Sequence, residues 1–110
     1  MRDSTTDAMT RVMEALCQHR GQLTETQAAQ LVGRSTSWFR HDFKRHRRVS
    51  FRTARLQAKL AHGAHLLTAT RLTVSDIAYL LGYSDRTKFE KSFKRLYGLT
   101  PVVYRAQAVT

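Results

Sequence analysis

The sequence contains two copies of one short pattern, and this duplication constrains the fold more than any other feature. One set of residues recurs after 49 positions: Leu23, Thr24, Ala29, Leu31, Gly33 and Ser35 match Leu72, Thr73, Ala78, Leu80, Gly82 and Ser84. A second set recurs after 50 positions: Phe39, Phe43, Lys44, Arg45 and Ser50 match Phe89, Phe93, Lys94, Arg95 and Thr100. We place the one inserted residue just after the serine, where a turn could absorb it. The chain should therefore fold as two similar units in series.

Each copy has the pattern of a helix, a tight turn and a second helix. In the first copy, Thr24 and Gln27 stand three residues apart, as in a capping box that opens a helix. Gly33 can end that helix, because glycine takes a left-handed conformation without a Cβ clash. Ser35 is then the expected N-cap of the next helix. The second copy repeats these signals at Thr73, Asp76, Gly82 and Ser84. Two helix-turn-helix units are therefore predicted.

The segments around the two copies also have helical spacing. One amphipathic helix should open near Ser4, and a short one should follow Thr100 and Pro101. A long helix should begin after Ser50, with one apolar stripe: Leu56, Leu60, Ala64 and Leu67. Strand signals are weak, so the predicted fold is all-α, with seven helices and two helix-turn-helix lobes joined by a long linker helix. The expected segments are 1–49 for the N-terminal helix and first lobe, 50–70 for the linker helix and 71–110 for the second lobe.

Composition limits the classes of partner. The 110 residues include 19 Lys and Arg against 8 Asp and Glu, a net charge of +11. Such an excess favours nucleic acid as partner, with an anionic membrane surface second. No apolar run approaches the roughly 18–20 residues of a membrane span, and the N-terminus lacks a signal peptide's apolar stretch. The only cysteine, Cys17, cannot form an internal disulfide. We expect a cytoplasmic protein without a membrane partner.

The second helix of each copy has an apolar side and a cationic side. With Phe39 and Phe43 buried, helical spacing puts Ser37, His41 and Lys44 on the opposite side, flanked by Arg40 and Arg45. With Phe89 and Phe93 buried, the opposite residues are Thr87, Lys91 and Lys94, and Arg86 lies in the first turn. Such a helix can lie in the major groove of DNA, with its first turns at base edges and its cations at phosphates.

The chain resembles the DNA-binding domain of AraC/XylS-type transcription regulators. The stretch "DIAYLLGYSDRTKFEKSFKRLYGLTPVVYR" resembles the family's second helix-turn-helix unit, "QAAQLVGRSTSWFRHDFKR" the first, and "KLAHGAHLLTATRLTVSDIA" the linker. The similarity runs from about residue 8 to residue 106.

The resemblance implies a bilobed, seven-helix domain whose two recognition helices enter successive major-groove segments of duplex DNA. The base-reading residues it implies are Ser37, Arg40, His41, Arg86, Thr87 and Lys91. The expected phosphate contacts are Arg34, Ser35, Lys44, Arg45, Ser84, Lys88 and Lys94. The family's members are transcription activators, sometimes repressors, that contact RNA polymerase. Most also carry an effector or dimerisation domain that 110 residues cannot supply, so we expect a monomer that is either a stand-alone member or part of a longer regulator.

Three positions depart from the family's pattern. Arg48 stands where the second copy has Gly98, so the first unit's turn should be strained or differently shaped. His41 stands where the family often has arginine, which would weaken a guanine contact. Gly63 replaces a usual alanine and could mark close packing.

Other functions have less support. His62 and His65 are spaced as a ligand pair, but no cysteine or acid lies nearby in sequence, so neither a metal nor another cofactor is expected. The acids are scattered, with no pair for general acid and base catalysis, so an enzyme is not expected. The alternatives are a non-specific nucleic-acid-binding architectural protein, which would use the charge without reading bases, and a protein interaction module.

Overall fold

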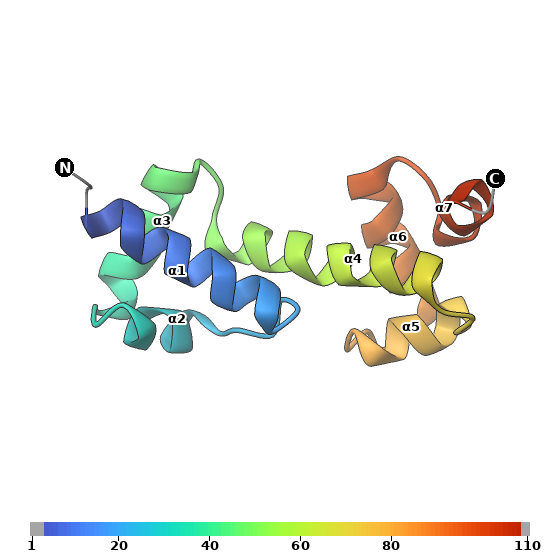
Figure 1. The fold of residues 1–110 in the computed structure, drawn as a ribbon, viewed down its shortest axis with the longest axis horizontal. Helices are drawn as coiled ribbons and strands as arrows, with labels where there is room; N and C mark the ends of the chain where they lie inside the picture. Colours follow the sequence, from blue (N-terminus) through green and yellow to red (C-terminus); the bar gives the residue numbers. More distant parts are fainter. Residues whose placement is uncertain (1–3, 109–110) are drawn as a thin grey trace. The chain divides into compact units, whose positions relative to one another are not determined.

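The chain is helical throughout the part that the structure describes. The computed structural model describes the backbone of residues 4–108 and the side chains of residues 6–108. It has seven helices over this range (Figure 1): α1 Ser4–Gln18, α2 Glu25–Leu31, α3 Thr36–Arg47, α4 Phe51–Ala69, α5 Val74–Leu80, α6 Arg86–Tyr97 and α7 Pro101–Ala108. No strand occurs between residues 4 and 108. The predicted all-α fold with seven helices is confirmed.

The helices form two compact units, one up to Ala58 and the other from Lys59 onward. Helix α4 contributes to both cores, because its first turns bury Phe51 and Ala54 in the first unit and its later turns bury Leu60, Ala64 and Leu67 in the second. The predicted apolar stripe of this helix is therefore wrong at its first member. Leu56 is 38% exposed, since Phe51 and Ala54 are the residues that face the first core.

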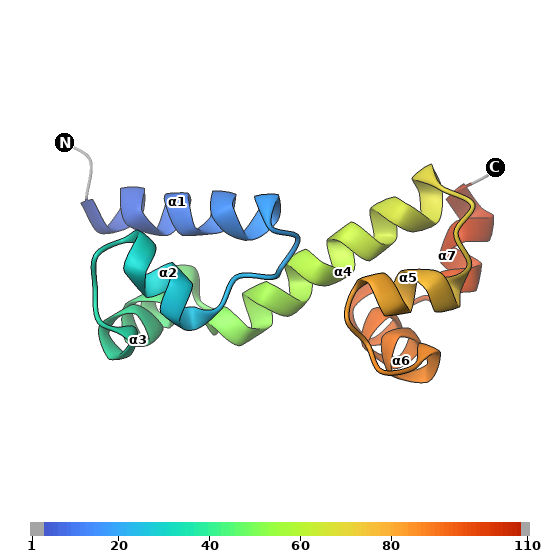
Figure 2. The same ribbon diagram turned by 90° about the horizontal axis from the view of Figure 1, so that it is seen from below.

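The core of the first unit is built around three phenylalanines. Phe39 and Phe43 of α3 and Phe51 of α4 have ring centroids 5.0–5.5 Å apart, in tilted and edge-to-face pairs. Val12 and Leu16 of α1 are fully buried in the same cluster, and α1 lies alongside α2 and α3 (Figure 2). Because both phenylalanines of α3 face this core, the other side of α3 is left to solvent.

The second unit repeats this arrangement with a larger aromatic cluster. Phe89 and Phe93 of α6 are fully buried. The Phe93 ring stacks on Tyr97 at 4.5 Å and meets Tyr104 of α7 edge-on at 5.3 Å. Edge-to-face and offset pairs of this kind stabilise a core beyond the area they bury. The cluster fixes which side of α6 faces outward.

Gly63 in α4 marks a close contact, as predicted. A Cβ atom at this position would lie 2.9 Å from Cδ1 of Leu81 and 3.3 Å from Cε1 of Phe89. These distances are shorter than ordinary van der Waals contacts, so the absence of a side chain allows α4 to approach both residues closely.

The predicted capping boxes are present in both units. The Gln27 N–H donates to Thr24 Oγ1 and the Thr24 N–H donates to Gln27 Oε1, each at 3.0 Å. Thr73 and Asp76 make the same reciprocal pair at the start of α5. Gly33 has a φ of 69° just after α2, so the glycine ends that helix in the left-handed conformation.

The cap of α6 differs from the prediction. Ser35 caps α3 by accepting the Trp38 N–H at 3.1 Å, as expected. The cap of α6 is Asp85, which accepts the Lys88 N–H at 2.9 Å, so the assignment of this role to Ser84 is wrong. The inserted residue therefore lies before the cap rather than after it. A carboxylate caps a helix as well as a hydroxyl does, and the positive end of the helix dipole also stabilises its negative charge.

The turn after α3 has the same backbone shape as the turn after α6. Arg48 has φ 68° and ψ 5°, and Gly98 has φ 77° and ψ −4°. Their N–H groups donate to the carbonyl oxygens of Lys44 at 2.9 Å and Lys94 at 2.8 Å. A left-handed conformation costs an L-residue about 1–2 kcal/mol. The turn is therefore strained, which is one of the two alternatives predicted from the sequence. The other alternative is wrong, because the backbone shape is the same as in the second unit.

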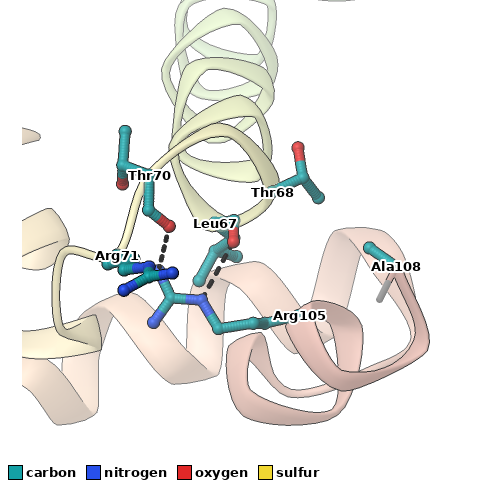
Figure 3. Close-up of a pocket in the computed structure, with 6 residues that line it drawn as sticks. All are labelled: Leu67, Thr68, Thr70, Arg71, Arg105 and Ala108. Carbon is teal, nitrogen blue, oxygen red and sulfur yellow. Dashed lines mark hydrogen bonds between the residues drawn. The ribbon is translucent and has the colours of Figure 1, made fainter. Parts of the chain in front are cut away.

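An arginine ties α7 to the end of α4 in the second unit. Arg105 Nε donates to the Leu67 carbonyl at 2.9 Å, and its terminal nitrogen donates to the Thr70 carbonyl at 3.4 Å (Figure 3). These carbonyls lie at the C-terminal end of α4, where helical partners are lacking and positive charge is favoured. The first unit has an equivalent but longer hydrogen bond, from Arg55 Nε to the Gly21 carbonyl oxygen at 3.5 Å.

Replacing Arg105 by glutamine should therefore destabilise the second unit by about 1–3 kcal/mol, the usual range for hydrogen bonds to charged groups. Urea unfolding followed by circular dichroism measures this change. Arg71 and Arg105 line one surface hollow at the end of α4 (Figure 3). Arg71 makes no recorded hydrogen bond or ion pair among residues 4–108. Arg71→Gln is the matched control, and an equal loss in both variants would contradict the role of Arg105.

Candidate nucleic-acid interface

The outer side of α3 carries most of the residues predicted to touch DNA in the first unit. Five of them line one shallow surface hollow of about 450 Å³: Ser37, Arg40, His41, Lys44 and Arg45. All five are exposed, while Phe39 and Phe43 on the opposite side have no exposed surface. A hollow with three permanent cations and no acid in its lining favours an anionic ligand.

Two of these arginines are held by acids. Arg40 Nε donates to Glu25 Oε2 at 2.9 Å, which joins α3 to the start of α2. The hydrogen bond and the charge of Glu25 raise the pKa of Arg40 above its usual value. Arg45 pairs with Asp42 at 3.0 Å. These contacts restrict the freedom of the two guanidinium groups.

The remaining candidates of the first unit lie just before α3. Ser35 accepts the cap hydrogen bond of the helix. The guanidinium carbon of Arg34 lies 4.6 Å from the ring centroid of Trp38, which is close enough for a cation–π contact. Trp38 is half-buried and packs against the core of this unit. The ring therefore holds Arg34 next to the first turn of the helix.

The outer side of α6 is also cationic. Arg86, Thr87 and Lys91 are exposed, and Arg86 Nε pairs with Glu90 Oε1 at 2.9 Å. Lys91 makes no recorded ion pair among residues 4–108, and neither do two further exposed residues of this helix, Lys88 and Lys94. Ser84 is exposed too, but it lies in the turn before the helix.

Three acidic contacts of the candidate residues were not predicted from the sequence, and one of them is the Arg45–Asp42 pair with i, i+3 spacing. The Arg86–Glu90 pair has the i, i+4 spacing of a helical ion pair, so that spacing could have revealed it. The Arg40–Glu25 pair joins residues fifteen positions apart in different helices, and no local pattern indicates it.

Two other kinds of site have no support within the described range. Between residues 4 and 108, no group of three or more His, Cys, Asp or Glu side chains could hold a metal ion. The His62 and His65 rings stack 6.4 Å apart, and they belong to no such group among the residues that the structure describes. None of the helices in this range is long and apolar enough to cross a bilayer.

Comparison with known proteins agrees with this geometry. Residues 28–107 match the model of a family described as a helix-turn-helix domain. The chain is 34% identical over 79 residues, 72% of its length, to the HTH-type transcriptional regulator GlxA of Rhizobium meliloti. These residues make up 24% of that regulator, and the matched parts make up 14% to 32% of the curated relatives.

Solved structures show the same fold. A transcriptional regulator with an AraC-type DNA-binding domain from Chromobacterium violaceum superposes with a TM-score of 0.88 at 20% identity, covering 97% of this chain and 96% of that one. The DNA-binding domain of the transcription factor AdpA, solved in complex with a target DNA, superposes with a TM-score of 0.76 at 19% identity, over 90% of each chain. The family is one of transcription regulators rather than enzymes. The chain belongs to the family of AraC-type helix-turn-helix DNA-binding domains.

Proposed function

We propose that this chain is the part of a transcription regulator that binds duplex DNA sequence-specifically. The observation that carries the proposal is the repetition of one arrangement. In each unit a recognition helix buries two phenylalanines and turns hydroxyl and cationic side chains to solvent. One such face could be an ordinary solvated surface. Two on equivalent helices indicate one shared task.

Each recognition helix has the donors that base reading needs. In α3 these are Ser37, Arg40 and His41, and in α6 they are Arg86, Thr87 and Lys91. Arginine and lysine donate to guanine O6 and N7, and hydroxyls can bond to either kind of base edge. Glu25 and Glu90 would orient Arg40 and Arg86 before contact, which reduces the freedom that each side chain loses on binding.

The neighbouring cations would supply most of the affinity through phosphates. The cations in this role are Arg34, Lys44, Arg45, Lys88 and Lys94, and the hydroxyls of Ser35 and Ser84 would add neutral hydrogen bonds to phosphates. Lys and Arg that neutralise phosphates release bound counterions, so affinity should fall steeply with salt. If α3 and α6 enter successive major-groove segments, the two half-sites lie about one helical turn, roughly 10–10.5 base pairs, apart.

We extend the proposal to the regulator's cellular role by analogy with the family. The chain would act in the cytoplasm as an activator that contacts RNA polymerase, and these 110 residues would bind DNA as a monomer. The AdpA domain was solved with a target DNA, and its shared fold supports the DNA-binding part of this extension.

A mobility shift of this chain with a selected pool of random duplexes, at about 150 mM salt, tests the proposal. We expect a subset of sequences to be enriched and to compete better than unrelated duplexes of equal length. The net charge of +11 favours one rival, an architectural protein that binds any duplex equally. If no sequence is enriched above non-specific binding, that rival is correct and base reading is rejected.

A further inference from the structure

Three arginines lie in and beside the turn after α3, where the second unit has neutral residues at the equivalent positions. The offset of 50 pairs each member of one set with one of the other: Arg47, Arg48 and Arg52 with Tyr97, Gly98 and Val102. We call the three arginines the arginine corner. All three are exposed. Because the two turns have nearly the same backbone, the difference between them lies in the side chains.

Two members of the arginine corner occupy positions that disfavour arginine. Arg48 holds a left-handed conformation, which glycine adopts without strain. Arg52 lies in the first turn of α4, where the positive end of the helix dipole repels a cation. The local backbone conformation and the helix dipole therefore do not explain an arginine at either position. Strained residues occur at functional sites, but Arg20 is also left-handed with a φ of 57°, so the case for the arginine corner depends on its charge and its place next to α3.

The charge of the arginine corner is also uncompensated. No acidic residue occurs in the sequence between Asp42 and Asp76. Asp42 is already paired with Arg45 at 3.0 Å and is almost fully buried. The three arginines make no recorded ion pair among residues 4–108. They are therefore available for an external anion.

The arginine corner continues the outer side of α3. Ser37, His41 and Lys44 follow one another at helical spacing along that side, and Arg48 comes four residues after Lys44. Arg52 then lies in the first turn of the next helix. An extended polyanion bound along α3 would therefore also contact these arginines. A small anion would contact only a few of the residues along this side.

We propose that the arginine corner is a second DNA contact, which binds phosphates adjacent to the base pairs read by α3. This inference rests on the proposed function for the partner, but it does not require base reading. The bound groups are phosphates because five-donor guanidinium side chains fit them well and because no base edge is available beyond the groove. The equivalent turn of the second unit makes no such contact.

Arg48→Gly and Arg20→Gly form a matched pair for testing this contact. Both residues are exposed arginines with positive φ, 68° at Arg48 and 57° at Arg20, but Arg20 follows α1 instead of α3. Each variant loses one charge and one strained residue, so both should fold, with melting temperatures unchanged or raised by about 2–5 °C. Fluorescence anisotropy with a labelled duplex of about 30 base pairs, at several salt concentrations, then gives the salt dependence of binding.

Arg48→Gly should reduce the slope of log affinity against log salt by about 1, and R47Q/R48G/R52Q by about 2–3, while Arg20→Gly leaves it nearly unchanged. The loss should be the same for preferred and unrelated duplexes. Equal slopes in Arg48→Gly and Arg20→Gly would overturn the inference. A changed base preference in these variants would also overturn it. Binding to vesicles of anionic phospholipid is measured in parallel, and a loss of affinity for the vesicles alone would overturn the inference too. Failure of the proposed function would show separately, as a wild-type chain that prefers no sequence.

Discussion

Replacing Phe93 by alanine is expected to lower the free energy of unfolding of the second unit by about 3–5 kcal/mol, the usual cost of removing a fully buried phenylalanine. Phe93 has no exposed surface, and its ring contacts Phe89, Tyr97 and Tyr104 with centroids 4.5–5.7 Å away. Three rigid aromatic rings cannot fill the vacated space without moving their helices, so a cavity should remain. Urea unfolding monitored by circular dichroism measures the effect.

The matched control for Phe93→Ala is Thr87→Ala on the same helix. Thr87 is exposed and makes no recorded side-chain hydrogen bond among residues 4–108, so its loss should change the free energy of unfolding by less than about 0.5 kcal/mol. Thr87→Ala should instead alter the preferred base at one position of the binding site. Equal destabilisation by both changes would mean that α6 presents a different side to DNA.

Replacing Lys91 by alanine is expected to weaken binding to the preferred duplex by about 5- to 150-fold, the range that corresponds to 1–3 kcal/mol for a specific contact with a base. Lys91 is exposed on the outer side of α6, in the same row as Thr87, and no acid on the described residues neutralises it. Binding to unrelated duplexes should fall much less. Anisotropy titrations with both kinds of duplex give the two losses.

Lys88→Ala controls for the loss of charge alone. Lys88 is an exposed neighbour on α6 with a predicted phosphate contact, so its removal should weaken binding to all duplexes alike and reduce the salt slope by about 1. If Lys91→Ala also weakened all duplexes equally, Lys91 would be a phosphate contact and its assignment to base reading would be wrong.

Local patterns in the sequence were enough to predict the helices, because the signals that start and stop them act over a few residues. The capping boxes at Thr24 and Thr73 and the helix end at Gly33 are present as predicted. The phenylalanine pairs also defined the buried sides of α3 and α6, since two aromatic residues four apart must face the same way. The exposed positions of the candidate DNA contacts follow from that geometry.

The errors arose where tertiary contacts or an insertion decided the result. Ser84 was assigned as the cap of α6 because it matches Ser35, but the extra residue of the second turn shifts the cap to Asp85. Leu56 fits a helical stripe, yet Phe51 and Ala54 take the place against the first core. The link between Arg40 and Glu25 depends on how α2 packs against α3, so the sequence pattern does not contain it.

Selection of binding sites from random duplex DNA, followed by sequencing, tests most directly whether both recognition helices read bases. The experiment compares the wild-type chain with two variants, His41→Ala in α3 and Thr87→Ala in α6. We predict one wild-type motif with two preferred segments about one helical turn apart, in which each variant loses preference within a different segment. A motif that both variants leave unchanged, or the absence of any enriched motif, would contradict the account.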